Sequence, residues 1–218
     1  TQTQRNVVVE SNSIRFVKDE LPAGCASAEC AFIVSREIGG VRKDQFGSFL
    51  DFSVKAWQKQ GICTESLWWN TKSANLDNYE AIPTDRTKAL RQSELHTIDG
   101  YATAVSFEDV KDAIYNNGFV LMAINIFDNW LENNCEGLFP DPKGNMIGSH
   151  ALCWVGYDED NLYCLHPWAS WSLLGGISRK YFDIAHLTAF VPLDSMETNV
   201  AKEHYAKLTV TTDILSNI

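Results

Sequence analysis

One stretch, residues 147–168, constrains the fold of this chain more than any other. It holds two apolar runs separated by the acidic turn Asp-Glu-Asp-Asn at residues 158–161. The first run, residues 151–155, contains no helix breaker, and the second begins at Leu162 and ends at Trp168. Short apolar runs joined by a tight polar turn are typical of a β-hairpin whose strands are largely buried. The sequence therefore predicts such a hairpin in the second half of the chain.

Two histidines lie near the outer ends of this hairpin. His150 precedes the first run, and His166 lies in the second. Because residues equidistant from the turn of an antiparallel pair lie opposite each other, the two side chains are predicted to come close in space. A histidine beside a polar side chain forms the core of an oriented general base. The alternative is a hydrogen-bonded structural histidine, which is the commoner role at the start of a strand.

Size and charge restrict the classes of partner. A chain of 218 residues fits one domain, or two small lobes around a shared cleft. The formal net charge of −10 argues against nucleic acids and anionic membranes as partners. No apolar run approaches the length of a membrane span, and no basic-then-apolar signal segment opens the sequence. Because the sequence begins at Thr1 without a methionine, we expect a processed or excised product of something larger, such as a precursor.

The cysteines suggest neither a metal nor a required disulfide framework. Six cysteines occur, at positions 25, 30, 63, 135, 153 and 164. A chain of this size does not need disulfides to fold, and Cys153 and Cys164 lie in apolar strands, where buried free thiols are expected. No second close pair of Cys or His accompanies Cys25 and Cys30, so the spacing does not suggest zinc. We predict no metal and no cofactor.

Helices are predicted mainly in the first half of the chain and strands in the second. The predicted helices lie at 31–38, 49–60 and 106–118, and the predicted strands at 119–125, 151–155, 162–168, 177–181 and 187–192. Residues 1–20 are expected to form one or two extended segments. Residues 70–100 are expected to be a loop with room for one short helix, and residues 133–148 a loop. Gly39 suits the C-terminal cap of the first helix. Ser106, with Asp109 three residues later, suits the N-terminal cap of the third helix. This order predicts an α+β fold, with a helical N-terminal lobe and an antiparallel β-rich C-terminal lobe meeting at a cleft.

The hairpin resembles the histidine-bearing hairpin of papain-like cysteine peptidases. The resemblance rests on Gly-Ser-His-Ala, four apolar residues and Gly-Tyr-Asp, which begin at Gly148, and on the strand that leads to Trp168. In that family the histidine pairs with a cysteine nucleophile, an asparagine orients the imidazole, and a tryptophan shields their contact. The resemblance places His150 at the histidine position, His166 at the asparagine position and Trp168 at the tryptophan position.

Two further segments extend the resemblance over roughly residues 15–193. Residues 61–68, Gly-Ile-Cys-Thr-Glu-Ser-Leu-Trp, look like the Gly-Val-Cys-x-Glu-Ser-Leu-Trp-Pro-Tyr segment of bacterial members. The helix that begins after Ser106 and the hydrophobic strand behind it also match. The resemblance implies a single papain-like domain, with a helical lobe over about 20–105, a β-lobe over about 106–193 and a C-terminal extension at 194–218. It points to bacterial or viral members, and to an extracellular, lysosomal-like or virion-associated setting.

The nucleophile position holds an alanine. The family motif Cys-Gly-Ser-Cys-Trp corresponds to Cys-Ala-Ser-Ala-Glu, which begins at Cys25, so Ala28 stands where the reactive cysteine belongs. Cysteine works there because a helix N-terminus and a neighbouring imidazolium stabilise its thiolate. Ala28 has no reactive atom. The resemblance further implies that Ser27, Ser149 and Trp168 line the cleft.

Two other family positions also depart from the catalytic pattern. The oxyanion donor of the family is a glutamine six residues before the nucleophile, and Pro22 stands there. Glu20 is the nearest candidate, but an ionised carboxylate accepts hydrogen bonds and repels an oxyanion, so the donor stays unknown. At the orienting position, a cationic His166 and a cationic His150 would disfavour each other.

The family cysteine that Cys25 matches usually forms a disulfide, but the segment that carries its usual partner is absent from this sequence. Two alternatives stay open: Cys25 pairs with Cys63, or Cys25 is a free thiol.

Three interpretations of position 28 follow. In the first, Ala28 is natural and the protein is a pseudoenzyme. In the second, Ala28 replaces the nucleophile of an active papain-like endopeptidase. In the third, Cys30 is the true nucleophile. The third is disfavoured, because a shift of two residues is about half a helical turn and would point Cys30 away from the cleft. Three departures together favour a catalytically degenerate protein that retains a peptide-binding cleft or a structural role.

The expected partner is a peptide or protein segment in the cleft, with a larger assembly as a further possibility. The extension at 194–218 is itself a candidate occupant of the groove. Its charged residues Lys202, Glu203 and Lys207 suit solvent better than a cleft, so we expect the extension on the outer surface and the groove free.

Overall fold

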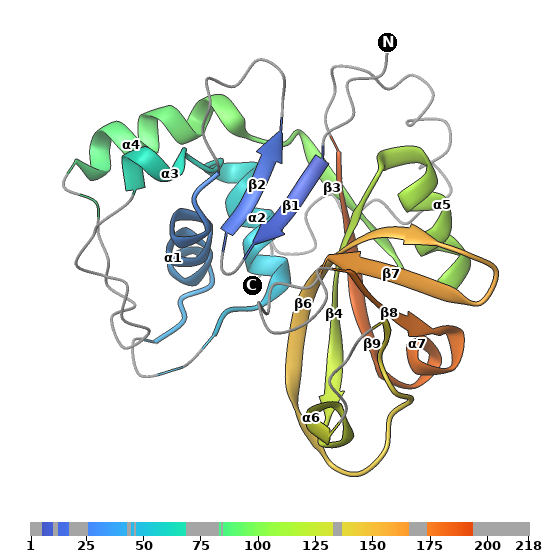
Figure 1. Ribbon diagram of the computed structural model, residues 1–218. Coiled ribbons are helices and arrows are strands. Elements are labelled where there is room, and N and C mark those ends of the chain that lie inside the picture. Colours follow the sequence, from blue (N-terminus) through green and yellow to red (C-terminus); the bar gives the residue numbers. More distant parts are fainter. Residues whose placement is uncertain are drawn as a thin grey trace, which may run out of the picture. The chain divides into compact units, whose positions relative to one another are not determined.

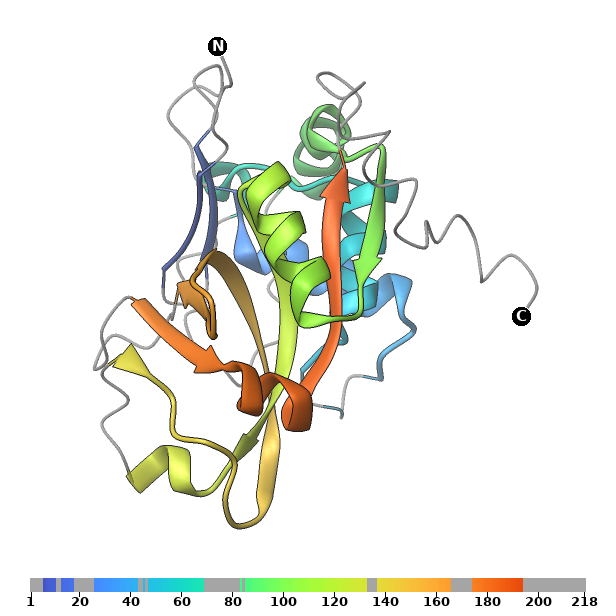
Figure 2. The ribbon, with the colours of Figure 1, turned by 90° about the vertical axis from the view of Figure 1, so that its right-hand side faces the viewer.

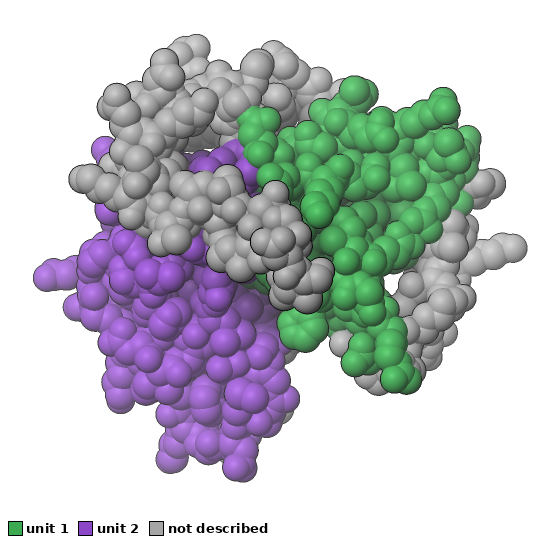
Figure 3. Space-filling view, turned by 180° about the vertical axis from the view of Figure 1, so that it is seen from behind, with its two compact units in different colours: residues 1–99 green, residues 100–218 purple. Residues whose placement is uncertain are grey.

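A computed structural model of the chain forms two compact units, residues 1–99 and residues 100–218 (Figure 3). It describes residues 6–10, 13–17, 26–42, 45, 47–68, 83, 85–132, 137–165 and 174–193. Each unit has its own cluster of buried apolar side chains. The predicted loop around 70–82 and the extension at 194–218 lie outside the described residues. No helix in the described part of the chain combines the length and apolarity needed to cross a membrane.

Unit 1 consists of a two-stranded hairpin and a set of short helices (Figure 1). Its elements are β1 (Asn6–Glu10), β2 (Ser13–Val17), α1 (Ala28–Ile38), α2 (Leu50–Lys59), α3 (Glu65–Trp68), α4 (Arg86–Ser93) and the 3-10 turn η1 (Glu94–His96). The first two helices confirm the predictions at 31–38 and 49–60. The short helix that the sequence allowed within residues 70–100 is α4, and its periodicity is weak because only Ala89 and Ser93 of this polar helix are buried. The side chain of Asp85 caps α4 by accepting a hydrogen bond from the Lys88 amide at 2.9 Å.

Unit 2 is built on a mixed sheet of seven described strands in the order β3-β9-β4-β6-β7-β8-β5. The strands are β3 (Gly100–Ala104), β4 (Val120–Phe127), β5 (Gly137–Leu138), β6 (Met146–Tyr157), β7 (Asn161–Leu165), β8 (Leu174–Ser178) and β9 (His186–Leu193). All neighbours are antiparallel except β5 and β8. The helices are α5 (Phe107–Asn117), α6 (Asn129–Glu132) and α7 (Arg179–Ala185). Helices followed by a mostly antiparallel sheet confirm the predicted α+β class.

The core of unit 2 lies between the sheet and two helices, α5 and α7 (Figure 2). Alternate residues of β4, among them Met122 and Ile124, are buried and meet Leu152 and Trp154 of β6 on the same face. The Trp154 indole donates to the Met122 carbonyl at 3.0 Å, so its polar atom stays satisfied in the core. Apolar alternation with period two is what fixes such a strand to one face.

Helix α5 begins and ends at the predicted residues. The Ser106 hydroxyl accepts from the Asp109 amide at 3.1 Å, and the Asp109 carboxylate accepts from the Ser106 amide at 3.0 Å. This reciprocal pair satisfies amides that the first helical turn leaves without partners. Gly118 ends the helix in a left-handed conformation with φ of 84°. Phe107 of α5 and Phe182 of α7 meet edge to face, with ring centroids 5.4 Å apart.

The strand predicted at 177–181 is wrong in its second half. The chain leaves β8 at Ser178, whose hydroxyl caps α7 by accepting from the Tyr181 amide at 3.0 Å. Tyr181, Phe182 and Ala185 are then buried at helical spacing. Tyr181 also donates its hydroxyl proton to the Asn125 carbonyl at 2.7 Å. A short apolar run does not distinguish a strand from one turn of helix, and the serine cap decides here.

Two strand boundaries also differ from the predictions. Strand β6 begins at Met146, inside the predicted loop 133–148, because its exposed first residues still pair with the end of β4. Residues 100–104, placed with the helical lobe by the sequence analysis, form β3 and pair with β9 in unit 2. In both cases cross-strand hydrogen bonding extends beyond the apolar residues that the sequence pattern detects.

The turn between β6 and β7 is held by one carboxylate. Asp158 accepts from the amides of Asp160 at 2.9 Å and Asn161 at 2.8 Å, and from the Tyr163 hydroxyl at 2.6 Å. These hydrogen bonds, with that from Tyr163 first, lower the pKa of Asp158 to about 2. The acidic turn recognised in the sequence is therefore an Asx-type turn that sets the hairpin register.

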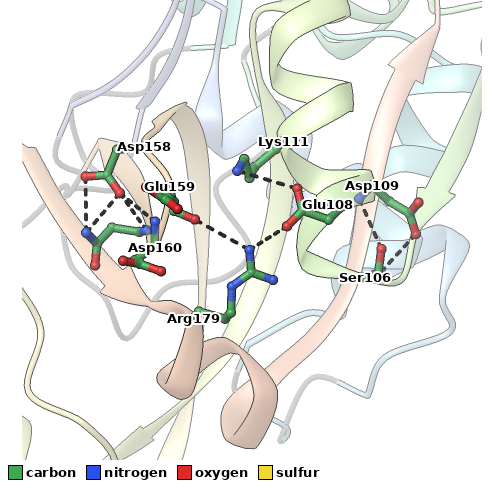
Figure 4. Close-up of polar contacts among 9 residues, drawn as sticks. Ser106, Glu108, Asp109, Lys111, Asp158, Glu159, Asp160 and Arg179 are labelled. Atoms are coloured by element: carbon green, nitrogen blue, oxygen red, sulfur yellow. Dashed lines mark hydrogen bonds and ion pairs between the residues drawn. The ribbon is translucent and has the colours of Figure 1, made fainter.

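Arg179 connects this turn to both helices (Figure 4). Its backbone amide donates to the Asp160 carbonyl at 2.7 Å, and its guanidinium bonds the carboxylate of Glu108, which Lys111 also approaches at 3.4 Å. The guanidinium lies over the Phe107 ring, 4.1 Å from the centroid. Exposed ion pairs contribute little stability on their own. The arrangement therefore positions the hairpin relative to α5 and α7 more than it stabilises unit 2.

Gly61 occupies a position that rejects any side chain. Its φ is 77°, and a Cβ there would lie 1.8 Å from the Ser93 carbonyl oxygen. We expect Gly61→Ala to lower the free energy of unfolding by about 3 kcal/mol or more, since left-handed strain of about 1–2 kcal/mol adds to a backbone clash. Gly40→Ala is the matched control, because Gly40 has φ of 61° and nothing within 4 Å of its added Cβ. Urea unfolding followed by circular dichroism should show a larger loss of unfolding free energy for Gly61→Ala than for Gly40→Ala. Equal losses would show that the clash with the Ser93 carbonyl has no effect.

Candidate functional site

The position that the sequence analysis matches to the family nucleophile lies at the start of a well-formed helix. Ala28 is the first residue of α1, and Ser27 caps the helix by accepting from the Cys30 amide at 3.1 Å. Serine is among the preferred residues at this place, and Ser27 is only 2% exposed. Free amides and the helix dipole at such a position lower the pKa of a thiol. The methyl group of Ala28 has nothing to ionise.

The segment at 61–68 holds the start of α1 in place. Ala26 and Thr64 form an antiparallel bridge, and the Ser27 amide donates to the Cys63 carbonyl at 2.9 Å. The Thr64 amide in turn donates to the Gln92 side chain at 3.0 Å. The stretch singled out for its resemblance to bacterial peptidases therefore has a structural role, because it fixes the backbone at Ala26 and Ser27.

Cys30 lies in the core of unit 1. It is fully buried together with Cys63, Trp68 and Ala89. A nucleophile has to reach a substrate carbonyl, and a thiol packed in an apolar core does not. The burial of Cys30 therefore argues against the interpretation that Cys30 is the nucleophile, in agreement with the half-turn offset inferred from the sequence.

His150 lies on the core-facing side of β6. It is paired with Ile124 of β4, and alternation puts it on the same face as Leu152 and Trp154. Burial lowers the pKa of His150 to about 4. The imidazole is therefore neutral at pH 7, whereas a thiolate–imidazolium pair requires it to be charged.

Ser149 faces the opposite side of the strand. It is exposed, and its hydroxyl donates to the Asn125 side-chain oxygen at 2.9 Å. Consecutive strand residues point to opposite faces, so Ser149 and His150 do not share a surface. The sequence analysis did not single out Asn125; its signal was a polar residue at the end of an otherwise apolar strand.

The predicted site residues divide between the two units. Ala28 and Ser27 belong to unit 1, and Ser149 and His150 belong to unit 2. His166 and Trp168 lie outside the described residues, as do Glu20, Pro22 and Cys25. The described part of β7 ends at Leu165, which pairs with Cys153.

No alternative site competes with these residues in the described parts of the chain. Within those parts, no three His, Cys, Asp or Glu side chains gather as metal ligands. An open hollow of about 450 Å³ in unit 2 contains none of the predicted site residues. It is lined by Asp160, Ser178, Arg179, Lys180, Asp183 and Ile184. Several of these side chains pair with neighbours of their own, which leaves a charged surface rather than a convergent site.

Comparison with solved structures identifies the fold. Xylellain, a cysteine protease from Xylella fastidiosa, superposes with a TM-score of 0.69 at 18% identity, over 81% of this chain and 72% of that chain. Procathepsin B from Trypanosoma congolense gives a TM-score of 0.56 at 20% identity, over 80% and 61%. The chain has the papain-like fold. Procathepsin L 3 from the larval midgut of Tenebrio molitor agrees, with a TM-score of 0.56 at 24% identity, over 79% and 56%.

These likenesses concern the fold. No protein-family model and no curated protein sequence matches the chain. The chain spans less than two thirds of the length of the two procathepsin chains. The papain-like fold expected from the hairpin and helix motifs is confirmed, and the roles of Ala28 and His150 rest on the geometry and chemistry of their own positions.

The low pKa of His150 has a measurable consequence. Because the folded pKa lies below the unfolded value of about 6.5, the unfolded chain takes up a proton first as the pH falls. The free energy of unfolding should therefore decrease between about pH 6.5 and pH 4, by on the order of 2 kcal/mol from this residue. His150→Gln should remove that part of the pH dependence.

Nuclear magnetic resonance titration of the histidine ring protons measures the same quantity directly. The His150 signal is expected to titrate near pH 4, and it is assigned by its loss in His150→Gln. A His150 signal that titrates at or above pH 6.5 would show that its apolar surroundings do not control its charge.

Proposed function

We propose that this papain-fold protein is a catalytically degenerate cysteine peptidase that binds an extended peptide or protein segment. The observation that carries the proposal is the position of Ala28 at the head of a serine-capped α1. A methyl group cannot attack a carbonyl or form a thioester. The helix start that serves a nucleophile is retained while the nucleophile is gone.

Three further features support the loss of catalysis. His150 has its pKa lowered to about 4 by burial, so it is uncharged at neutral pH. Pro22 stands at the position of the oxyanion donor, and His166 at that of the orienting asparagine. Removing one oxyanion donor typically costs about 10²–10³ in turnover. Replacement of residue 28 alone would not account for Pro22 or His166.

Peptide binding is the property that such a fold keeps when its thiol is lost. Binding of an extended segment depends on main-chain hydrogen bonds and apolar pockets, which a single side chain does not abolish. The net charge of −10 favours a peptide or protein over a nucleic acid as the partner. The support for peptide recognition is analogy at the level of the fold.

A second candidate is an active papain-like endopeptidase with alanine in place of its cysteine at position 28. The feature in its favour is the intact helix start. Ser27 keeps its cap, and its amide still bonds the Cys63 carbonyl at 2.9 Å. A cysteine placed there would have its pKa lowered by the helix N-terminus.

Restoring the thiol separates the two candidates. We expect Ala28→Cys to turn over fluorogenic dipeptide substrates far below 1 s⁻¹, the lower end of ordinary enzyme rates of about 1–10³ s⁻¹. Ala28→Ser serves as the control for background hydrolysis, and alkylation of the new thiol verifies that it is accessible. Turnover of about 1 s⁻¹ or faster, lost in Ala28→Ser, would favour the active endopeptidase.

Peptide binding is tested on the unsubstituted chain by fluorescence anisotropy with labelled extended peptides. Ala28→Trp should weaken binding about tenfold or more, because an indole at the start of α1 obstructs a segment that passes over it. Tyr115→Trp is the control, since Tyr115 is 78% exposed on α5 in unit 2. If no peptide binds the unsubstituted chain, the remaining interpretation is a purely structural domain.

A further inference from the structure

Unit 1 contains a pair of buried thiols close to the nucleophile position. Cys30 lies in the first turn of α1, and Cys63 lies in the segment just before α3. Both are 0% exposed, and both belong to the apolar cluster of unit 1. The two cysteines are distant in sequence but belong to the same buried cluster. The helix α2, which lies between them in sequence, packs against α1.

The backbone brings these two residues together. The Ala26–Thr64 bridge places Ser27 beside Cys63, and the Ser27 amide donates to the Cys63 carbonyl at 2.9 Å. Cys30 follows one helical turn later, on the side of α1 that Ser27 begins, and its amide donates to the Ser27 hydroxyl at 3.1 Å. A disulfide requires Cα atoms about 4.4–6.8 Å apart, and these two hydrogen bonds through Ser27 hold Cys30 and Cys63 in the same neighbourhood.

The side chains are in contact as well. The Cys30 and Cys63 thiols share a hydrogen bond, which lowers the pKa of Cys30 and raises that of Cys63. Cys30 also lies in the first turn of α1, where the helix N-terminus favours a thiolate, so we take Cys30 as the attacking thiol. The more acidic thiol of a close pair is the nucleophile in thiol–disulfide exchange.

The other described pair of buried cysteines differs in each respect. Cys153 pairs with Leu165 and Cys164 with Trp154, so their side chains point to opposite faces of the β6–β7 hairpin. Burial raises the pKa of both thiols, to about 12 for Cys153. Proximity on paired strands does not by itself make a disulfide pair, and this pair supplies an internal control.

We propose that Cys30 and Cys63 are a redox pair that closes into an intramolecular disulfide in the presence of a disulfide oxidant such as oxidised glutathione. The Cys30 thiolate attacks one glutathione sulfur and releases the first glutathione as a thiol. The Cys63 thiolate then attacks the Cys30 sulfur of the mixed disulfide and releases the second. The protein loses two protons and two electrons, and one glutathione disulfide becomes two glutathione thiols.

The disulfide would join the first turn of α1 to the segment that holds its start. It closes a loop from Cys30 to Cys63 that includes α2. Closing a loop of this size restricts the unfolded chain and is expected to raise the melting temperature by about 5–10 °C. Because both thiols are buried, oxidation requires local opening of the first turn of α1 and should be slow relative to that of an exposed thiol.

The test uses the full chain equilibrated in mixtures of oxidised and reduced glutathione. Digestion without reduction by a glutamate-specific protease, which cuts after Glu29 and so separates Cys25 from Cys30, should yield one cross-linked species that contains Cys30 and Cys63. The rise in melting temperature should accompany it, and both should disappear after treatment with dithiothreitol. Cys30→Ala and Cys63→Ala should each abolish both signals. Cys153→Ala should retain both signals, because Cys153 belongs to the β6–β7 hairpin of unit 2 and not to the Cys30–Cys63 pair.

Peptide mapping of the unsubstituted chain keeps the result interpretable even if a variant fails to fold. A cross-link between Cys63 and Cys25, the pairing left open by family resemblance, would overturn the proposal. It would also be overturned if Cys30 and Cys63 both remained labelled by a thiol reagent after oxidation and denaturation.

Discussion

The pairing of β4 with β6 is the interaction on which unit 2 depends. Eight residues of β4 pair with β6, from Val120 opposite Trp154 to Phe127 opposite Met146. The Trp154 indole bonds the Met122 carbonyl, which ties the register to a buried polar contact as well as to apolar packing. Since a slip of one residue would exchange the two faces of the strand, this register decides that His150 faces the core side and Ser149 the other.

Unit 1 is organised on a smaller scale. The start of α1 is held by one isolated bridge, one backbone hydrogen bond to Cys63 and the Ser27 cap. Few interactions of this kind allow local opening at lower free energy than a long strand ladder does. A covalent link between Cys30 and Cys63 would therefore act directly on the helix start that carries Ala28.

Much of the fold follows from local sequence signals. The Ser106–Asp109 capping box, the left-handed Gly118 and the Asp158 turn each determine one boundary by chemistry within a few residues. Features that depend on distant partners were not predictable. Strand β3 is defined only by β9, and the helix at Tyr181 depends on its packing beneath the sheet and on the Asn125 carbonyl.

The same distinction applies to the candidate site. Ala28 and His150 could be proposed as site residues from sequence because the motifs around them are contiguous. The neutral state of His150 could not be predicted in this way, because it depends on the burial of the imidazole in the folded protein. The contact between Cys30 and Cys63 likewise appears only when the segment at 61–68 is folded against α1.

The charge of His150 and the residue at position 28 are not independent signs of lost catalysis. In a thiolate–imidazolium pair each charge stabilises the other, so the loss of a thiolate leaves the effect of burial, which lowers the pKa of His150, less opposed. That outcome is the same whether the alanine arose naturally or replaced a cysteine. Pro22 and His166 do discriminate, because a change at position 28 alters neither the missing oxyanion donor nor the missing orienting amide. A chain under selection for peptide hydrolysis has reason to keep both groups, whereas a chain selected for binding or for structure does not.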